Sequence, residues 1–139
     1  IHCVIEIYNK IAVKHYKVKK FCQDANKSNL IDLKLQEIID DFSQLDEKGK
    51  NRLSLGSGLY KLRISTNSGQ GKSSGSRAIL TIRNSDVVFW LHIYPKNKKE
   101  NITLTELGRL KKLSNILLNL TSIEIKKLLT MGELIEVLS

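Results

Sequence analysis

The first third of the chain carries the hydrophobic periodicity of a helix. Apolar residues recur every three or four positions, and acidic residues fall between them on the other side. The apolar positions are Leu35, Ile38, Ile39, Phe42 and Leu45. A less regular helix is predicted before this one, over residues 16–26, and a turn at residues 48–51 is predicted to end the pair. Short strands are predicted near both ends, over residues 3–7 and 134–138.

The middle third changes to a period of two, which is typical of strands. Apolar and basic side chains alternate over residues 59–65, so that Lys61 and Arg63 share one face of the predicted strand. Two further strands are predicted over residues 77–83 and 87–94, joined by a short Asn-Ser-Asp turn. A long Gly/Ser-rich loop separates the first strand from the second. The pattern therefore predicts an antiparallel meander.

The last third returns to a helical pattern with recognisable capping residues. Thr103 with Glu106, and Thr121 with Glu124, have the spacing of a capping box, in which each side chain binds a backbone N–H of the other residue. A stripe of leucines follows the first box: Leu104, Leu107, Leu110, Leu113, Leu117 and Leu120. Gly132 is predicted to end the second, shorter helix.

Positive charge is concentrated in one part of the chain. The net charge is +9, and residues 50–100 contribute +8 of it, from ten Lys and Arg side chains against two acidic ones. Clustered charge of one sign attracts a polyanion, and each neutralised phosphate releases counterions. The basic region, from about Lys50 to Lys99, is therefore predicted to meet nucleic acid; a solvated basic face without a partner is the alternative.

The remaining composition narrows the class of protein. No apolar run exceeds five residues, far short of the roughly 20 that cross a bilayer, and the N-terminus has no signal-peptide pattern. Cys3 and Cys22 are too few and too far apart for a disulfide scaffold or a redox pair. We expect a cytoplasmic protein with reduced cysteines and no membrane contact.

Two common kinds of site are not supported. The Gly-Lys-Ser of residues 71–73 resembles the end of a phosphate-binding loop, but Thr66 stands where the first glycine is required. A predicted strand also follows, where that motif needs a helix N-terminus. The three histidines, His2, His15 and His92, have no carboxylate or cysteine at metal-ligand spacing, so neither a metal nor a cofactor is expected.

The basic side chains of the meander are candidates for a common surface. In the third strand, Trp90, His92 and Tyr94 are predicted to lie opposite an apolar face formed by Val87, Phe89, Leu91 and Ile93. A two-residue turn would pair Arg77 with Tyr94, whereas a three-residue turn would send Arg77 to the other face. With the first turn, the shared surface comprises Lys61, Arg63, Arg77, His92, Tyr94 and Lys96. A polar face exposed to water is the alternative.

Such a surface can favour the cleavage of RNA. Attack of a ribose 2′-hydroxyl on the adjacent phosphate builds up negative charge, which fixed Lys and Arg donors stabilise. Neighbouring cations lower the pKa of a lysine, which makes Lys61, Lys72 or Lys96 a candidate general base. Tyr94 is a candidate for stacking on a base or positioning the leaving group. Trp90 is a second stacking candidate, with core packing as the alternative for both rings.

Five segments in order along the chain resemble the RelE-type toxins of bacterial type II toxin-antitoxin modules, within the RelE/ParE superfamily and closest to its HigB-like members. The resemblance covers roughly residues 13–138. Its segments are Gly58-Leu59-Tyr60-Lys61-Leu62-Arg63-Ile64, Gly69-Gln70-Gly71-Lys72-Ser73 with Arg77 after it, Tyr94-Pro95-Lys96-Asn97, residues 102–113, and Gly132-Glu133-Leu134-Ile135-Glu136.

This resemblance implies an α+β fold, in which a compact antiparallel sheet has N-terminal and C-terminal helices packed against it, as one domain over residues 1–139. It implies a metal-independent, ribosome-dependent endoribonuclease that cuts translated mRNA. The implied partner is a cognate antitoxin of the helix-turn-helix type, through which alone operator DNA is bound. The implied catalytic residues are Lys61, Arg63, Arg77, Tyr94 and Lys96; Lys72, His92, Lys98 and Lys99 would bind RNA.

Two other functions remain open at this point. The superfamily also contains ParE-type gyrase inhibitors, which share the scaffold without the cleavage chemistry. A degenerate toxin that acts only as an antitoxin-bound corepressor is the second alternative. Both are non-catalytic inhibitory or binding modules.

Overall fold

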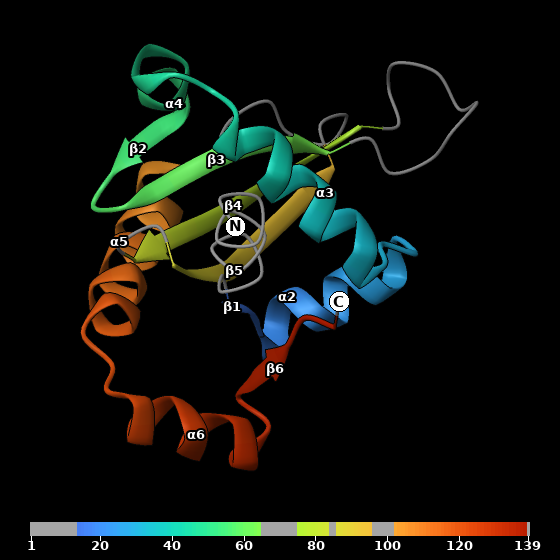
Figure 1. Cartoon of the computed structure of the whole chain (residues 1–139), viewed down its shortest axis with the longest axis vertical. Helices are drawn as coiled ribbons and strands as arrows, with labels where there is room; N and C mark the ends of the chain where they lie inside the picture. Colours follow the sequence, from blue (N-terminus) through green and yellow to red (C-terminus); the bar gives the residue numbers. More distant parts are fainter. Residues whose placement is uncertain (1–13, 65–74, 84–85, 96–101, 139) are drawn as a thin grey trace, which may run out of the picture.

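A computed structural model of the chain describes residues 14–64, 75–83, 86–95 and 102–138. In these parts six strands form one sheet, accompanied by five helices (Figure 1). The strands are β1 (Lys14–Val18), β2 (Ser54–Gly56), β3 (Leu59–Ile64), β4 (Ser76–Arg83), β5 (Val87–Pro95) and β6 (Leu134–Glu136). The helices are α2 (Lys19–Lys27), α3 (Asp32–Ser43), α4 (Glu47–Leu53), α5 (Leu104–Leu118) and α6 (Ser122–Met131).

The strand order is β2-β3-β4-β5-β1-β6. The predicted meander is confirmed, because β3, β4 and β5 pair antiparallel as neighbours. β1 then pairs parallel with β5, and β6 pairs antiparallel with β1. The sheet is therefore mostly antiparallel, and its helices identify an α+β fold as expected.

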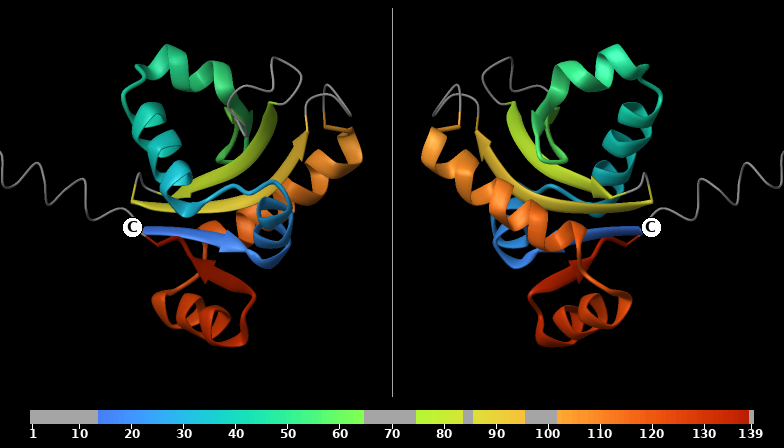
Figure 2. Two further views of the ribbon diagram at one scale, coloured as in Figure 1. Left: turned by 90° about the vertical axis from the view of Figure 1, so that its right-hand side faces the viewer. Right: turned by 90° about the vertical axis from the view of Figure 1, so that its left-hand side faces the viewer.

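The sheet has a hydrophobic core on each face. On one face, α2 and α3 cover a cluster that includes Phe21, Leu35, Leu80 and Trp90. On the other, Leu117 of α5 and residues of α6 pack over a second cluster. Figure 2 shows α3 and α4 on one side of the sheet and α6 on the other. The face with the first cluster is called the α3 face, and the face with the second cluster is called the α5 face.

Three predicted elements differ in the structure. The helix predicted over residues 16–26 begins only at Lys19, because Tyr16 lies in β1 and stacks on Phe89 with ring centroids 5.6 Å apart. The turn predicted at residues 48–51 lies within α4, whose N-terminus is capped by Asp46 through a 2.8 Å bond from Gly49 N. Leu104 does not belong to the leucine stripe, since it is 87% exposed. The strand predicted over residues 3–7 lies outside the described residues.

The C-terminal helices follow their capping signals. Both predicted capping boxes are present, with Glu106 and Glu124 as the reciprocal partners of Thr103 and Thr121. Gly132 ends α6 in the left-handed conformation, with a φ of 78°. The chain then turns directly into β6, as the predicted C-terminal strand requires.

The turn between β2 and β3 accepts hydrogen bonds from side chains of α5 and β4. Ser114 Oγ donates to the Ser57 carbonyl at 2.7 Å, and Thr81 Oγ1 donates to the Gly58 carbonyl at 2.9 Å. Gly58 itself has a φ of 78°, and a Cβ there would lie 3.0 Å from a methyl carbon of Leu118. The turn therefore needs glycine both for its conformation and for its space.

We predict opposite stability changes for alanine at two glycines. Gly58→Ala should lower the free energy of unfolding by at least about 1–2 kcal/mol, the cost of the left-handed conformation alone. Gly108→Ala should raise it by about 0.5–1 kcal/mol, because Gly108 lies within α5 with nothing within 4 Å of an added Cβ. Urea denaturation of both variants measures this. Equal effects at the two positions would contradict the assigned turn.

His15 of β1 is placed to make stability depend on pH. Burial lowers the pKa of His15 from 6.5, and Asp40 opposes this shift only in part. Its Nδ1 is buried without a hydrogen bond to the described residues. The unfolded state therefore binds more protons below pH 6.5, so this contribution is complete above that value and is lost as the pH falls.

We expect the free energy of unfolding to fall between about pH 7.5 and about pH 5.5, and His15→Gln to reduce this fall. Urea denaturation of both proteins at the two pH values provides the measurement. An identical fall in the variant would show that another group is responsible.

No helix in the described segments has the length and apolar character needed to cross a bilayer.

Candidate nucleic-acid interface

The candidate site is built around a row of residues that crosses three neighbouring strands. Arg63 of β3 pairs with Arg77 of β4, and Arg77 pairs with Tyr94 of β5. Two positions along, Lys61 pairs with Ile79, and Ile79 pairs with His92. Because side chains alternate along a strand, these positions lie on the α5 face, the face that carries buried Ile79 and Tyr94.

A β-bulge produces this pairing. Arg83 pairs with Val87, so three residues separate β4 from β5, and such a turn would by itself send Arg77 to the opposite face. The register then shifts between Ile79 and Leu80, because Leu80 pairs with Trp90 while Ile79 pairs with His92. One extra residue in β5, Leu91, therefore restores the pairing of Arg77 with Tyr94.

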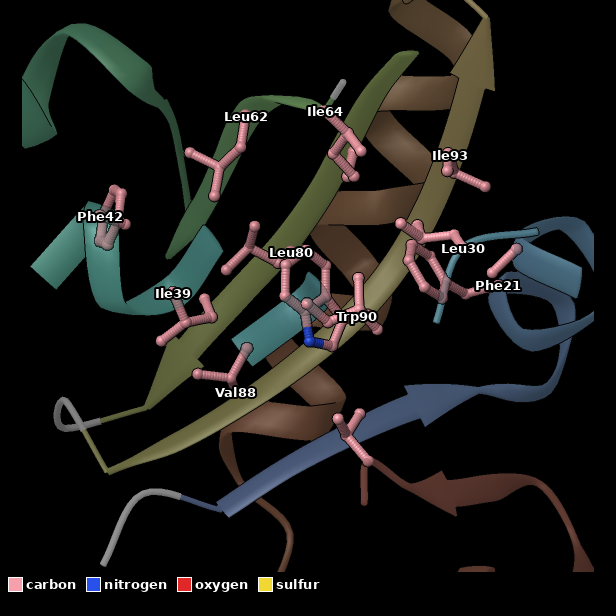
Figure 3. Packing of buried hydrophobic residues seen from close by; sticks show 14 residues of the cluster. Phe21, Leu30, Ile39, Phe42, Leu62, Ile64, Leu80, Val88, Trp90 and Ile93 are labelled. Atoms are coloured by element: carbon pink, nitrogen blue, oxygen red, sulfur yellow. The ribbon is translucent and has the colours of Figure 1, made fainter. Parts of the chain in front are cut away.

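Because of the same bulge, two residues of β5 lie on a different face of the sheet than predicted. Strict alternation predicts Trp90 beside His92 and Tyr94, and Ile93 beside Leu91, but Trp90 and Ile93 each lie on the other face. Trp90 is fully buried on the α3 face, 5.6 Å from the ring of Phe21 (Figure 3). The core alternative is thus the correct one for Trp90, and base stacking by this residue is excluded in this structure.

Arg77 has the environment expected of an anion-binding residue. Its side chain is half-buried between the strand positions of Arg63 and Tyr94. One guanidinium nitrogen, Nη1, is buried and makes no hydrogen bond within the described part of the chain. Buried polar groups are rarely left unpaired, so such a donor is typical of a ligand site. A phosphate oxygen would supply the missing acceptor.

His92 lies between Tyr94 of this row and Glu106 at the beginning of α5. Their rings lie 5.6 Å apart, and His92 Nε2 is 3.8 Å from a carboxylate oxygen of Glu106. Tyr94 is only 3% exposed, with its hydroxyl inside the protein. Base stacking needs an exposed ring face, so the position of Tyr94 in this structure favours a positioning role beside Arg77.

The two outer basic residues differ in exposure. Lys61 is half-buried, whereas Arg63 is exposed because β2 ends before it and leaves this part of β3 at the sheet edge. Arg63 also borders a pocket of about 280 Å³ between α3, α4 and β3. The other predicted residues, Lys72, Lys96, Lys98 and Lys99, lie outside the described residues.

The sequence did not single out Glu106 as a neighbour of this surface. Its capping-box spacing predicts its role at the helix start, but the spacing carries no information on which strand the helix start meets.

Within the described segments, no three His, Cys, Asp or Glu side chains are grouped so that they could hold a metal ion. The arrangement can bind a phosphodiester and stabilise charge that develops on it.

Comparison with known proteins now identifies the chain. The family model of the RelE toxin of the RelE / RelB toxin-antitoxin system matches residues 13–137. No curated protein matches the chain. The match extends from β1 to the residue after β6, so it covers the sheet, all the described helices and the whole Arg63–Arg77–Tyr94 row. The chain therefore belongs to the RelE toxin family and is a toxin of a toxin-antitoxin system.

Proposed function

We propose that this toxin is a ribosome-dependent endoribonuclease that cuts translated mRNA and so inhibits translation. The observation that carries the proposal is the environment of Arg77 on the face shared with Lys61 and Arg63: its buried Nη1 has no hydrogen-bond partner among the residues that the structure describes. Family membership supports it, because RelE toxins generally cleave mRNA. The excess of basic residues between positions 50 and 100 supports binding of the RNA backbone.

The proposed reaction is attack of a ribose 2′-oxygen on the adjacent phosphorus. The O2′–P bond forms, the P–O5′ bond breaks, a general base takes the 2′ proton, and the departing 5′-oxygen receives a proton. The products are a 2′,3′-cyclic phosphate and a 5′-hydroxyl end. No oxidant, cofactor or metal ion is needed to balance this step.

Each residue of the site has a proposed role. Lys61, Arg63 and Arg77 bind the scissile phosphate and stabilise the charge that develops on its oxygens. Lys96 acts at the cleavage site with Tyr94, which positions Arg77 and the leaving group. The flanking RNA is bound by Lys72, His92, Lys98 and Lys99. On the ribosome, the message would be held while these groups act, which suits a protein working in the cytoplasm.

Induction of the protein in a bacterium, followed by primer extension on a translated message, tests the proposal. We expect new 5′ ends within the translated region and none when translation initiation on that message is blocked. An intact message with stalled supercoiling in a gyrase assay would instead identify a ParE-type inhibitor. Absence of growth arrest would identify a degenerate toxin that acts only with its antitoxin.

We also propose that the partner is a helix-turn-helix antitoxin, encoded by a neighbouring gene, and that operator DNA is bound only through it. Family membership supports an antitoxin partner, because the matched family is that of the RelE toxin of a toxin-antitoxin system. Co-expression of the neighbouring gene should abolish cleavage. DNA binding by the toxin alone at the operator would contradict the second part.

A further inference from the structure

A basic cavity lies at the opposite end of the strands from the candidate site. It has a volume of about 400 Å³ and is lined by residues of β1, of the β4–β5 end of the sheet and of α6. Arg83, at its edge, lies on the same strand face as Arg77 but six residues further along. At about 3.3 Å per residue, the two guanidinium-bearing positions are roughly 20 Å apart. The cavity is therefore separate from the proposed cleavage site.

Its charge is positive. Three cationic side chains from three different elements line it, namely Lys14, Arg83 and Lys126, against one carboxylate, Asp86. Arg83 Nη1 donates to the Leu120 carbonyl at 2.6 Å, which fixes the guanidinium at the cavity wall. Cationic side chains that converge on one cavity favour the binding of an oxyanion through charge-assisted hydrogen bonds.

The rest of the lining suits a group that is charged at one end and apolar elsewhere. Tyr16 lines the cavity while being only 6% exposed, and its hydroxyl makes no hydrogen bond to the described residues. Burial and the nearby Glu136 raise the pKa of Tyr16, so this hydroxyl keeps its proton and can donate it. Val87, Ile125 and Leu129 provide the apolar part of the wall.

We propose that this cavity binds a backbone phosphate of the RNA that the toxin engages, as a second contact about 20 Å from the cleavage site. A phosphate oxygen accepts hydrogen bonds from Lys14, Lys126 and the Tyr16 hydroxyl together, while the ribose or base covers the apolar wall. The proposal rests on the proposed function only in taking RNA as the target. This contact is tested by the binding of an RNA that cannot be cleaved, whereas the proposed function is tested by cleavage, so either can fail alone.

The test compares two double variants that remove the same charge. Lys14→Gln with Lys126→Gln removes two exposed lysines that line the cavity, whereas Lys19→Gln with Lys127→Gln removes two exposed lysines that do not. Each control lysine lies close to its counterpart in sequence. The probe is a short, fluorescently labelled single-stranded RNA whose 2′-oxygens are methylated, so that it cannot be cleaved. Fluorescence anisotropy at several salt concentrations measures affinity.

We expect the slope of log affinity against log salt to become shallower in the cavity variant, by about 0.7 for each phosphate that it no longer binds, and by less in the control. Equal changes in the two variants, or no change in either, would overturn the proposal. Far-UV circular dichroism and thermal unfolding check that both variants are folded. The single variants Lys126→Gln and Lys127→Gln give the same comparison if a double variant is unstable.

Two further arms distinguish other sources of the anion. Inorganic phosphate at constant ionic strength should not displace the RNA probe at concentrations near those in cells; displacement that the cavity variant abolishes would assign the site to free phosphate and overturn the proposal. Loss of antitoxin binding in the cavity variant, with an unchanged RNA slope, would assign the cavity to an acidic segment of the partner. That result would also overturn it.

Discussion

Replacing Arg77 by alanine should lower mRNA cleavage by a factor of about 10² to 10³, the usual cost of removing one donor to a developing oxyanion. Arg77 lies between Arg63 and Tyr94 in the strand row, and its Nη1 has no other acceptor among the described residues. Arg77→Lys should retain part of the activity, because a lysine keeps the charge but lacks the planar pair of donors. Single-turnover cleavage of a ribosome-bound message is the measurement.

Lys48→Ala is the matched control for this prediction. Lys48 is an exposed lysine of α4 that precedes the basic region, so its replacement removes the same charge from the protein without touching the sheet face. We expect cleavage by this variant to stay within a factor of about three of the parent, as for other exposed surface substitutions. Equal losses in both variants would mean that net charge, rather than the position of Arg77, determines the rate.

Replacing Trp90 by alanine should lower the free energy of unfolding by about 3–5 kcal/mol. Trp90 is fully buried in the α3-face core, and its removal leaves a large cavity beside Phe21 (Figure 3). A loss of this size is a substantial part of the total stability of a domain, so much of the variant would be unfolded. Urea denaturation followed by far-UV circular dichroism measures it, since the variant has no other tryptophan.

Trp90→Phe is the control, because it keeps an aromatic ring in the core and should cost clearly less. The parent protein also tests the alternative role of this residue. Its single tryptophan should keep the same fluorescence when RNA binds, since no base can reach a buried ring. Quenching on RNA binding, with little loss of stability in Trp90→Ala, would contradict the core assignment.

Local patterns predict the elements whose signals are contained within a few residues. Helix α3, strands β3, β4 and β5, both capping boxes and the end of α6 at Gly132 follow from periodicity and capping chemistry. The patterns fail where a short segment fits two structures. The helical spacing of Val18, Phe21 and Cys22 suits a helix that includes residues 16–18. Pairing with β5 and β6 makes residues 16–18 a strand instead, because tertiary contacts outweigh local patterns.

The candidate site also combines features that local patterns predict with features that depend on strand pairing. Alternation along β3 is sufficient to place Lys61 and Arg63 on one face, since a period of two needs no partner strand. The neighbours of Arg77 depend instead on the register between β4 and β5, which combines a three-residue turn with a bulge at Leu91. Neither feature alone predicts the outcome, and their effects cancel for Arg77 but not for Trp90.

The α+β class, the basic character of the central region and the residue types available to bind a phosphate therefore follow from the amino-acid sequence alone. Which of these residues meet depends on the packed fold. The fold places Arg77 beside Tyr94, buries Trp90 in the opposite core, brings Glu106 close to His92 and assembles the basic cavity between β1 and α6. The physical reason is that strand register and helix docking are set by the burial of residues far apart in the chain, which no local pattern records.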